Sequence, residues 1–202
     1  DVPSSGSDGT ATVALTVSAV SDEAGNTAEV VSSQTTSFII DNTAPTVTVE
    51  LSSNGSVYGP SLAQPVKAGD TVTIKASFIE SIGLSGSPTI TLQQDGNATV
   101  PPANTSLVGS ALEWTYAYTV LHDQNASVKV SVFAVDTAGN TLATQPAPAF
   151  VIDNTAPGVA ISYSDGGSSD VTGPYKSGDS VTVTSTFTET NAISGTPTLS
   201  LV

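Results

Sequence analysis

Acidic side chains recur at matched positions along this 202-residue chain, and they are the side chains with the most chemistry to offer. Asp41 opens the segment Asp-Asn-Thr-Ala-Pro, which returns unchanged at residues 153–157. Asp136 opens Asp-Thr-Ala-Gly-Asn, and Asp22 opens the similar segment Asp-Glu-Ala-Gly-Asn. Carboxylate oxygens that converge in space can bind a hard divalent cation. What these acids can do depends on the elements that position them.

The repeated segments divide the chain into units of about 110 residues. A third segment, Lys-Ala-Gly-Asp-Thr-Val from Lys67, returns as Lys-Ser-Gly-Asp-Ser-Val from Lys176, and all three recur in the same order at spacings of 109 to 114 residues. Such self-similarity is the signature of a repeat architecture. We predict the C-terminal part of one repeat and its linker at 1–45, a complete repeat at 46–157, and the N-terminal part of the next, with strands A to C, at 158–202.

Short runs of alternating apolar and polar residues predict an all-β fold. Gly, Asn and Asp, which favour turns, separate these runs. About seven strands in one unit are typical of an immunoglobulin-like β-sandwich, so the expected fold is a tandem array of such sandwiches. The predicted strands A to G lie at 46–51, 71–79, 88–94, within 98–108, 111–120, 127–135 and 148–153.

The alternating strand directions of a sandwich bring three acids to one end of the repeat. Glu80 follows strand B, Asp136 follows strand F, and Asp41 lies in the linker before strand A. Each pair of neighbouring carboxylates costs about 1 kcal/mol in water and about 4 kcal/mol at an effective dielectric near 20. A bound Ca²⁺ would relieve this repulsion, because oxygen-only ligand sets favour calcium over zinc or copper. Asn140 and the carbonyls of its turn are expected to supply further oxygens.

The same positions recur at the neighbouring junctions. Asp153 and Glu189 are expected to belong to the matching site of the next repeat, and Asp22 stands in the place of Asp136 for the preceding one. An ion held by a linker residue would also fix the junction between consecutive repeats. The alternative is that each acid only caps a turn, as Asp commonly does.

The charge balance, 18 acidic against four basic residues, argues against two classes of partner. Nucleic acid needs a dense cationic surface, and an anionic membrane surface attracts Lys and Arg. No apolar run reaches the roughly 18 residues of a spanning helix, so we expect no membrane insertion. The chain has one His and no Cys, and it has no Ser in a nucleophile elbow. The sequence therefore predicts no enzyme activity.

The linkers, the Phe-x-Glu segments that end at Glu80 and Glu189, and the Val-Asp-Thr-Ala-Gly-Asn turn together resemble the bacterial Ig-like repeats of giant secreted adhesins. The resemblance covers essentially the whole chain. It implies a role in adhesion or biofilm formation, an extracellular location, and Ca²⁺ at the domain junctions. The ligands that it implies are Asp41, Glu80 and Asp136, with the counterparts Asp22, Asp153 and Glu189.

We therefore expect a non-catalytic extender that calcium stiffens and whose partners are neighbouring repeats of the same chain. One alternative is a segment of an extracellular filament, in which identical chains complete one another's partial repeats by exchanging strands. Another is an accessory carbohydrate-binding module of a secreted enzyme. Such a module would need exposed aromatic rings, but Trp114, Tyr116 and Tyr118 alternate in predicted strand E, where we expect them to pack in the core.

Overall fold

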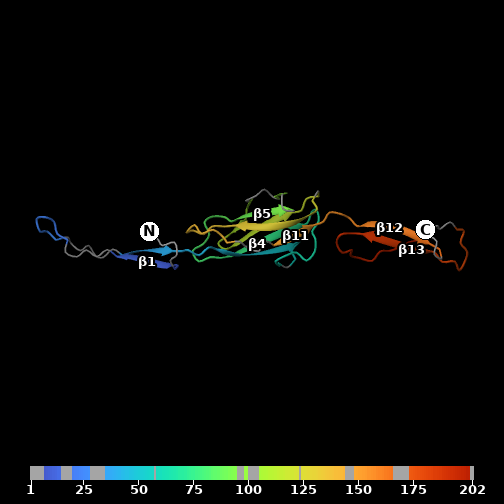
Figure 1. Ribbon diagram of the computed structural model, residues 1–202, viewed down its shortest axis with the longest axis horizontal. Coiled ribbons are helices and arrows are strands. Elements are labelled where there is room, and N and C mark those ends of the chain that lie inside the picture. The colour runs from blue at the N-terminus through green and yellow to red at the C-terminus, as the bar shows by residue number, and fades with distance from the viewer. Residues whose placement is uncertain are drawn as a thin grey trace. The chain divides into compact units, whose positions relative to one another are not determined.

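Two compact units, Asp1–Asp153 and Asn154–Val202, make up the computed structural model of the chain (Figure 1). The described residues form strands and turns without a helix, so they include no helical segment long and apolar enough to cross a membrane. The all-β prediction is confirmed. The structure describes residues 7–14, 20–27, 35–56, 58–94, 98–99, 105–122, 124–143, 148–165 and 173–200.

Two antiparallel sheets build the complete repeat. The first has the strand order β3-β4-β9-β8, and the second has the order β11-β10-β5-β6, with β7 also paired to β5. This is an immunoglobulin-like sandwich, with strands A, B, E and D in one sheet and C, F and G in the other. The strands are β3 (Thr46–Ser53), β4 (Thr71–Ile79), β5 (Thr89–Gln94), β6 (Ala98–Thr99), β7 (Thr105–Ser106), β8 (Val108–Ser110), β9 (Glu113–Thr119), β10 (Ala126–Phe133) and β11 (Ala149–Ile152).

Alternate residues of these strands form the hydrophobic core. Along β4, every second residue from Val72 to Phe78 is buried, as the alternating pattern predicts. Burial of one large aliphatic side chain contributes about 1.5–3 kcal/mol. Trp114 and Tyr118 are buried and Tyr116 packs against the core, which confirms the core prediction for these rings.

Strand D differs from the prediction of a single strand within 98–108. The structure has three short strands there: β6 and β7 pair with β5, whereas β8 pairs with β9. Pro101 and Pro102, which lie outside the described residues, have no N–H to donate to a ladder. Gly109 allows β8 to approach β9, because a Cβ at this position would lie 2.2 Å from the carbonyl oxygen of Glu113.

The flanking segments each form one pair of strands. β1 (Gly9–Ala14) pairs with β2 (Thr35–Ile40), and β12 (Gly158–Ser164) pairs with β13 (Thr182–Thr188). The predicted third strand of the last segment is absent from the described residues 189–200. In the complete repeat this strand is β5, which is held by β10, and the described part of the second unit has no counterpart of β10.

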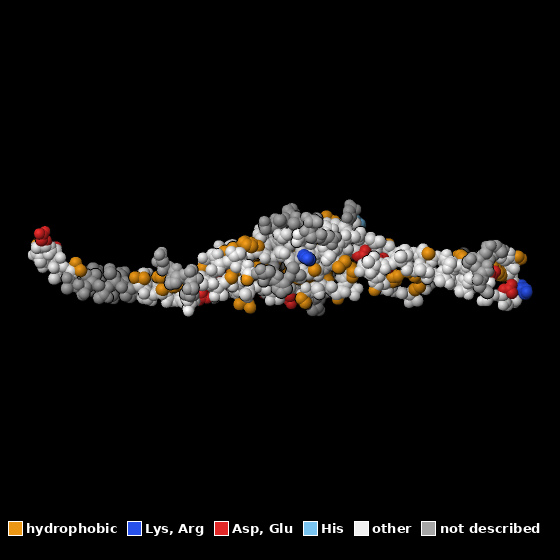
Figure 2. Space-filling view, in the orientation of Figure 1, with side chains coloured by type: hydrophobic (Ala, Val, Ile, Leu, Met, Phe, Trp, Pro, Cys, Tyr) orange, Lys and Arg blue, Asp and Glu red, His pale blue; other side chains and the backbone are white. Residues whose placement is uncertain are grey.

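Apolar side chains of β12 and β13 are exposed to solvent. Val159, Ile161, Tyr163 and Phe187 have exposed fractions of 38% to 58%, and Figure 2 shows apolar side chains at the surface of this unit. Among its described residues, the second unit therefore forms this strand pair without an opposing sheet that would bury it.

Candidate metal centre

The linker between β2 and β3 presents Asp41 to one end of the complete repeat. Asp41 Oδ1 accepts a hydrogen bond from the N–H of Thr43 at 2.9 Å, which is the Asx-turn that the alternative reading of the sequence predicts. The carbonyl oxygen of Asp41 accepts a hydrogen bond from the side-chain nitrogen of Asn140 at 3.1 Å. Pro45 is fully buried directly before β3. These contacts hold the linker against the repeat that follows it.

A tight turn after β10 buries Asp136 completely. Its Oδ1 accepts hydrogen bonds from the N–H groups of Ala138, Gly139 and Asn140 at 2.7–2.8 Å, and its Oδ2 accepts one from the Asn140 side chain at 2.8 Å. Burial acts to raise the pKa of Asp136, but the hydrogen bonds to the charged form outweigh it and lower the pKa below its ordinary value. The turn therefore keeps Asp136 as a carboxylate.

The loop after β4 brings Glu80 to the same end of the repeat. Glu80 Oε1 accepts hydrogen bonds from the N–H groups of Ser81 at 2.5 Å and Ile82 at 3.1 Å. Further along this loop, the N–H of Ser85 donates to the carbonyl of Val135 at 2.7 Å. Since Val135 directly precedes Asp136, this bond ties the loop of Glu80 to the turn of Asp136.

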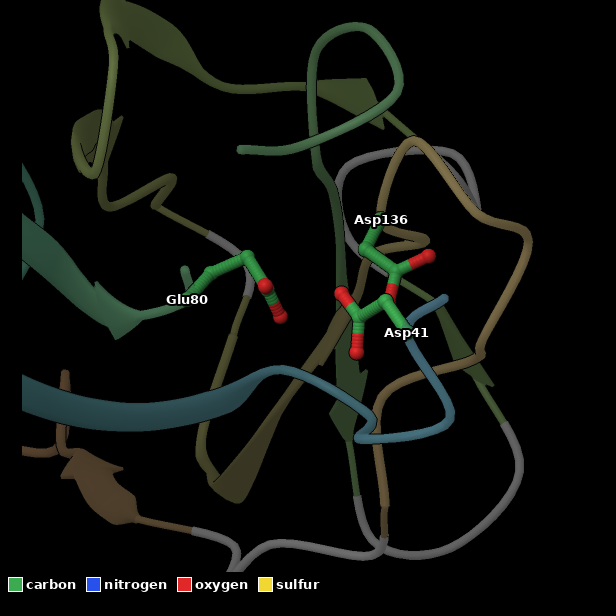
Figure 3. A group of neighbouring side chains, drawn as sticks. All are labelled: Asp41, Glu80 and Asp136. Carbon is green, nitrogen blue, oxygen red and sulfur yellow. The ribbon is translucent and has the colours of Figure 1, made fainter. Parts of the chain in front are cut away.

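Asp41, Glu80 and Asp136 point toward one another (Figure 3), and each offers an oxygen that lies within 4.8 Å of the others. Like charges at about 4 Å repel by roughly 4 kcal/mol per pair at an effective dielectric near 20. The ion pair in the described part of the chain, Lys75–Glu113 at 2.7 Å, involves none of the three acids. The structure thus brings together the three acids that strand direction predicts, while cation binding by them stays a prediction.

The donor set fits a hard divalent cation. Asp41 Oδ2 is buried and has no hydrogen-bond partner among the described residues, and a buried oxygen without a partner costs about 1–3 kcal/mol. Among the described residues, the hydrogen bonds of Glu80 go to Oε1, which leaves Oε2 available. Ca²⁺ takes six to eight oxygens at 2.3–2.6 Å, so the three carboxylates together with water could complete its shell.

A comparison with known families identifies the repeats. The family model described as bacterial Ig-like domain (group 3) matches residues 4–95 and 112–198, which is most of the chain. The chain belongs to this family. The two matches begin one repeat length apart, at residues 4 and 112, as expected for a tandem array. Searches of curated proteins and of solved structures found no significant match.

Membership of the bacterial Ig-like family bears on the predicted activity and location. Domains of this family are generally non-catalytic and structural, and they are typically exposed at the bacterial surface. Both points agree with the expectations from the sequence. The limits of the repeats, predicted at residues 45/46 and 157/158, stay a prediction.

Asn140 donates two side-chain hydrogen bonds in this repeat, while its predicted role as an oxygen ligand stays a prediction. Its side-chain nitrogen donates to Asp136 Oδ2 at 2.8 Å and to the carbonyl oxygen of Asp41 at 3.1 Å. Because both partners are acceptors, the amide must face them with its nitrogen. Asn140 therefore positions Asp136 and the linker, and does not turn its amide oxygen toward them.

Two of the predicted counterparts, Asp22 and Glu189, keep local hydrogen bonds like those of Asp136 and Glu80. Asp22 accepts hydrogen bonds from the N–H and the side chain of Asn26 at 2.8 and 2.7 Å, as Asp136 does from Asn140. Glu189 Oε1 accepts a hydrogen bond from the following N–H at 2.6 Å, as Glu80 does. In the described part of the chain Asp22 joins no group of three acids. Asp153 and Glu189 lie in different units, so their common site stays a prediction.

The sequence analysis missed Asp8. Its carboxylate accepts hydrogen bonds from the N–H of Asn42 at 2.7 Å and from the hydroxyl of Thr43. A signal for it exists in the repeat, because Asp8 precedes Ala11 by three residues just as Asp123 precedes Ala126.

Proposed function

We propose that this chain is a non-catalytic extender segment of a large bacterial cell-surface adhesin, whose repeat junctions are stiffened by Ca²⁺. The observation that carries the proposal is the buried, unpartnered Oδ2 of Asp41, which belongs to a group of carboxylates within 4.8 Å of one another. Asp41 lies in the linker, whereas Glu80 and Asp136 lie in the repeat. One ion bound to all three would cross-link the linker to the repeat and restrict bending at the junction.

Ca²⁺ binding should also stabilise the complete repeat. A ligand that binds only the folded state adds about 2.7 kcal/mol when its free concentration is 100 times its dissociation constant. For a unit of about 100 residues, each kcal/mol raises the melting temperature by about 4–8 °C. We therefore expect the melting temperature of the repeat to rise by roughly 10 °C or more in saturating calcium.

The test is calorimetry of the full chain with calcium and with a chelator. Asp41→Asn and Glu80→Gln each remove a ligand charge without changing side-chain size, and both should abolish most of the increase in melting temperature. Glu50→Gln is the matched control, because Glu50 is an acid of the same repeat outside the group of three. An Asp41→Asn chain that keeps the full calcium response would rule out this site.

Small-angle scattering of the same chain tests the mechanical part of the proposal. Calcium should increase the maximum dimension and reduce the flexibility of the chain, and the Asp41→Asn chain should not respond. Equal scattering with calcium and with chelator would rule out stiffening of the junction, even if calcium binds at the site.

A second candidate, assembly into an extracellular filament, is favoured by the exposed apolar side chains outside the complete repeat. Phe38 of β2 and Phe187 of β13 have exposed fractions of 44% and 38%. In the complete repeat, Phe150 matches Phe38 and Phe78 matches Phe187, and both are buried. Identical chains could bury these faces against one another. Sedimentation over a concentration series tests this candidate. A monomer at all concentrations would contradict it.

A further inference from the structure

Asp8, the residue directly before β1, holds the linker from the preceding partial repeat. Its Oδ1 accepts the N–H of Asn42 at 2.7 Å, and its Oδ2 accepts the hydroxyl of Thr43. The register of β1 and β2, which sets Gly9 opposite Ile40, brings Asp8 beside the first residues of the linker. Asp8 is not a member of the group formed by the three clustered carboxylates. It contacts the linker without being a candidate ligand.

Asp41, the linker residue directly before these two contacts, is the residue whose Oδ2 lacks a hydrogen-bond partner among the described residues. Thr43 is held at two of its polar groups, since its hydroxyl donates to Asp8 and its N–H donates to Asp41 Oδ1. The bond to Oδ1 fixes the carboxylate of Asp41, and its Oδ2 is the buried, unpartnered oxygen. Asn140 fixes the carbonyl of Asp41 from the complete repeat. The orientation of Asp41 therefore depends on bonds from both sides of the junction.

We infer that Asp8 is a positioning residue for the carboxylate site of the repeat that follows it: it fixes Asn42 and Thr43 so that Asp41 Oδ2 faces Glu80 and Asp136. The inference rests on the proposed calcium site. Its consequence is that cation affinity at one junction depends on the folding of the preceding strand pair, which supplies Asp8. The acid at position 123 gives the next junction the same sequence signal.

Calcium titration calorimetry of the full chain tests this inference. Residues that orient a metal ligand through a hydrogen bond typically contribute 10- to 100-fold to metal affinity, so Asp8→Asn should weaken calcium binding by about tenfold or more. Thr43→Val removes one of the two bonds and keeps the charge of Asp8, so it should weaken binding less. The double variant should bind calcium about as weakly as Asp8→Asn alone, less weakly than the sum of the single effects, because both changes break the same contact.

Two controls separate positioning from charge and from folding. Glu23→Gln removes one acidic charge from the same N-terminal segment and should leave calcium affinity near that of the unmodified chain. With chelator present, Asp8→Asn should leave the melting temperature of the complete repeat unchanged, because Asp8 lies outside it. If Glu23→Gln weakened binding as much as Asp8→Asn, the effect would come from net charge and the inference would be overturned.

Hydrogen exchange of the Asn42 amide in the calcium-free chain gives a readout that does not need the ion. Asp8→Asn should speed this exchange, and Glu23→Gln should not. Unchanged exchange together with unchanged calcium affinity would overturn the inference. If the unmodified chain bound no calcium, the proposed function would fail, and the exchange rate alone would decide whether Asp8 holds the linker.

Discussion

The pairs β3–β4 and β12–β13 have the same pattern and the same register but opposite exposure. Val47 lies opposite Phe78 in the first pair, and Val159 lies opposite Phe187 in the second. The exposed fraction of the Phe side chain is 5% in the first pair and 38% in the second. The difference arises because the second sheet of the complete repeat, built on β5, β10 and β11, has no counterpart in the described part of the second unit.

This comparison separates local from tertiary determinants of the fold. The turn before the second strand of each pair has the same hydrogen bond, from Asp70 N–H to Lys67 carbonyl at 3.0 Å and from Asp179 N–H to Lys176 carbonyl at 3.1 Å. Strand pairing therefore follows from short sequence signals. Burial needs the opposing sheet, and most of the stabilisation by apolar side chains depends on it.

The largest expected effect comes from truncating a side chain that only the complete repeat buries. Ile74→Ala should lower the free energy of unfolding by about 2–5 kcal/mol, because it removes buried methylene groups and leaves a cavity. Ile161→Ala, in the half-exposed β12, should change it by less than about 0.5 kcal/mol. Far-UV circular dichroism in a urea titration follows the strands of both units, and fluorescence of Trp114, the only Trp of the chain, separates out the unfolding of the complete repeat.

Equal losses of unfolding free energy in the two variants would contradict the difference in burial between the two strand pairs. They would mean that β12 and β13 are covered in solution as β3 and β4 are. Sedimentation of the unmodified chain would then show whether a second copy covers them.

The sequence predicts the strands well where alternation is regular and poorly where it is not. β4 and β10 follow from the spacing of Val and Ile, because a strand whose sheet packs on a second sheet with one face buries every second side chain. The prediction of a single strand D was wrong, because the short strands β6, β7 and β8 depend on pairing with both sheets. Gly109 illustrates the reason. A side chain at this position would collide with the carbonyl oxygen of Glu113, and no local sequence pattern contains that contact.

The same division applies to the candidate site. The convergence of Asp41, Glu80 and Asp136 could be predicted because strand direction alone determines which ends meet. The donor role of Asn140 and the contact between Asp8 and the linker could not, because they depend on side-chain orientation. Recurrence marks a residue as important to the repeat, but it does not distinguish a ligand from a residue that holds a ligand.

A second prediction compares the two Asp-x-Ala-Gly-Asn turns. Asp136→Ala should destabilise the complete repeat by about 2–3 kcal/mol in chelator, because it removes a buried carboxylate that accepts hydrogen bonds from three N–H groups. Asp22→Ala breaks the same bonds in an exposed turn, where water can replace the acceptor, so it should have little effect. Urea titrations followed by Trp114 fluorescence measure Asp136→Ala, and far-UV circular dichroism of the full chain measures Asp22→Ala, because Asp22 lies outside the complete repeat that Trp114 reports. A small effect of Asp136→Ala would show that the turn relaxes toward solvent.

The smallest expected effect is the pH dependence that Asp70 contributes. The N–H of Lys67 and the side chain of Asn54 donate to its carboxylate at 2.9 Å, and they lower its pKa. Because the pKa is lower in the folded state, the stabilisation is fully present above the unfolded pKa of about 3.9 and is lost as the pH falls through the folded pKa. The carboxylate is partly exposed, so solvent screening limits the contribution to less than about 1 kcal/mol.

The test for Asp70 is the difference in free energy of unfolding between the unmodified chain and Asp70→Asn, measured at pH 6 and again below pH 3. The difference should shrink in acid, because the protonated carboxyl no longer favours the folded state. Asp179→Asn is the matched control: Asp179 accepts the N–H of Lys176 at 2.9 Å in the same turn of the second unit, but Trp114 does not lie in that unit. A difference that stayed constant in acid would assign the role of Asp70 to turn geometry instead of charge.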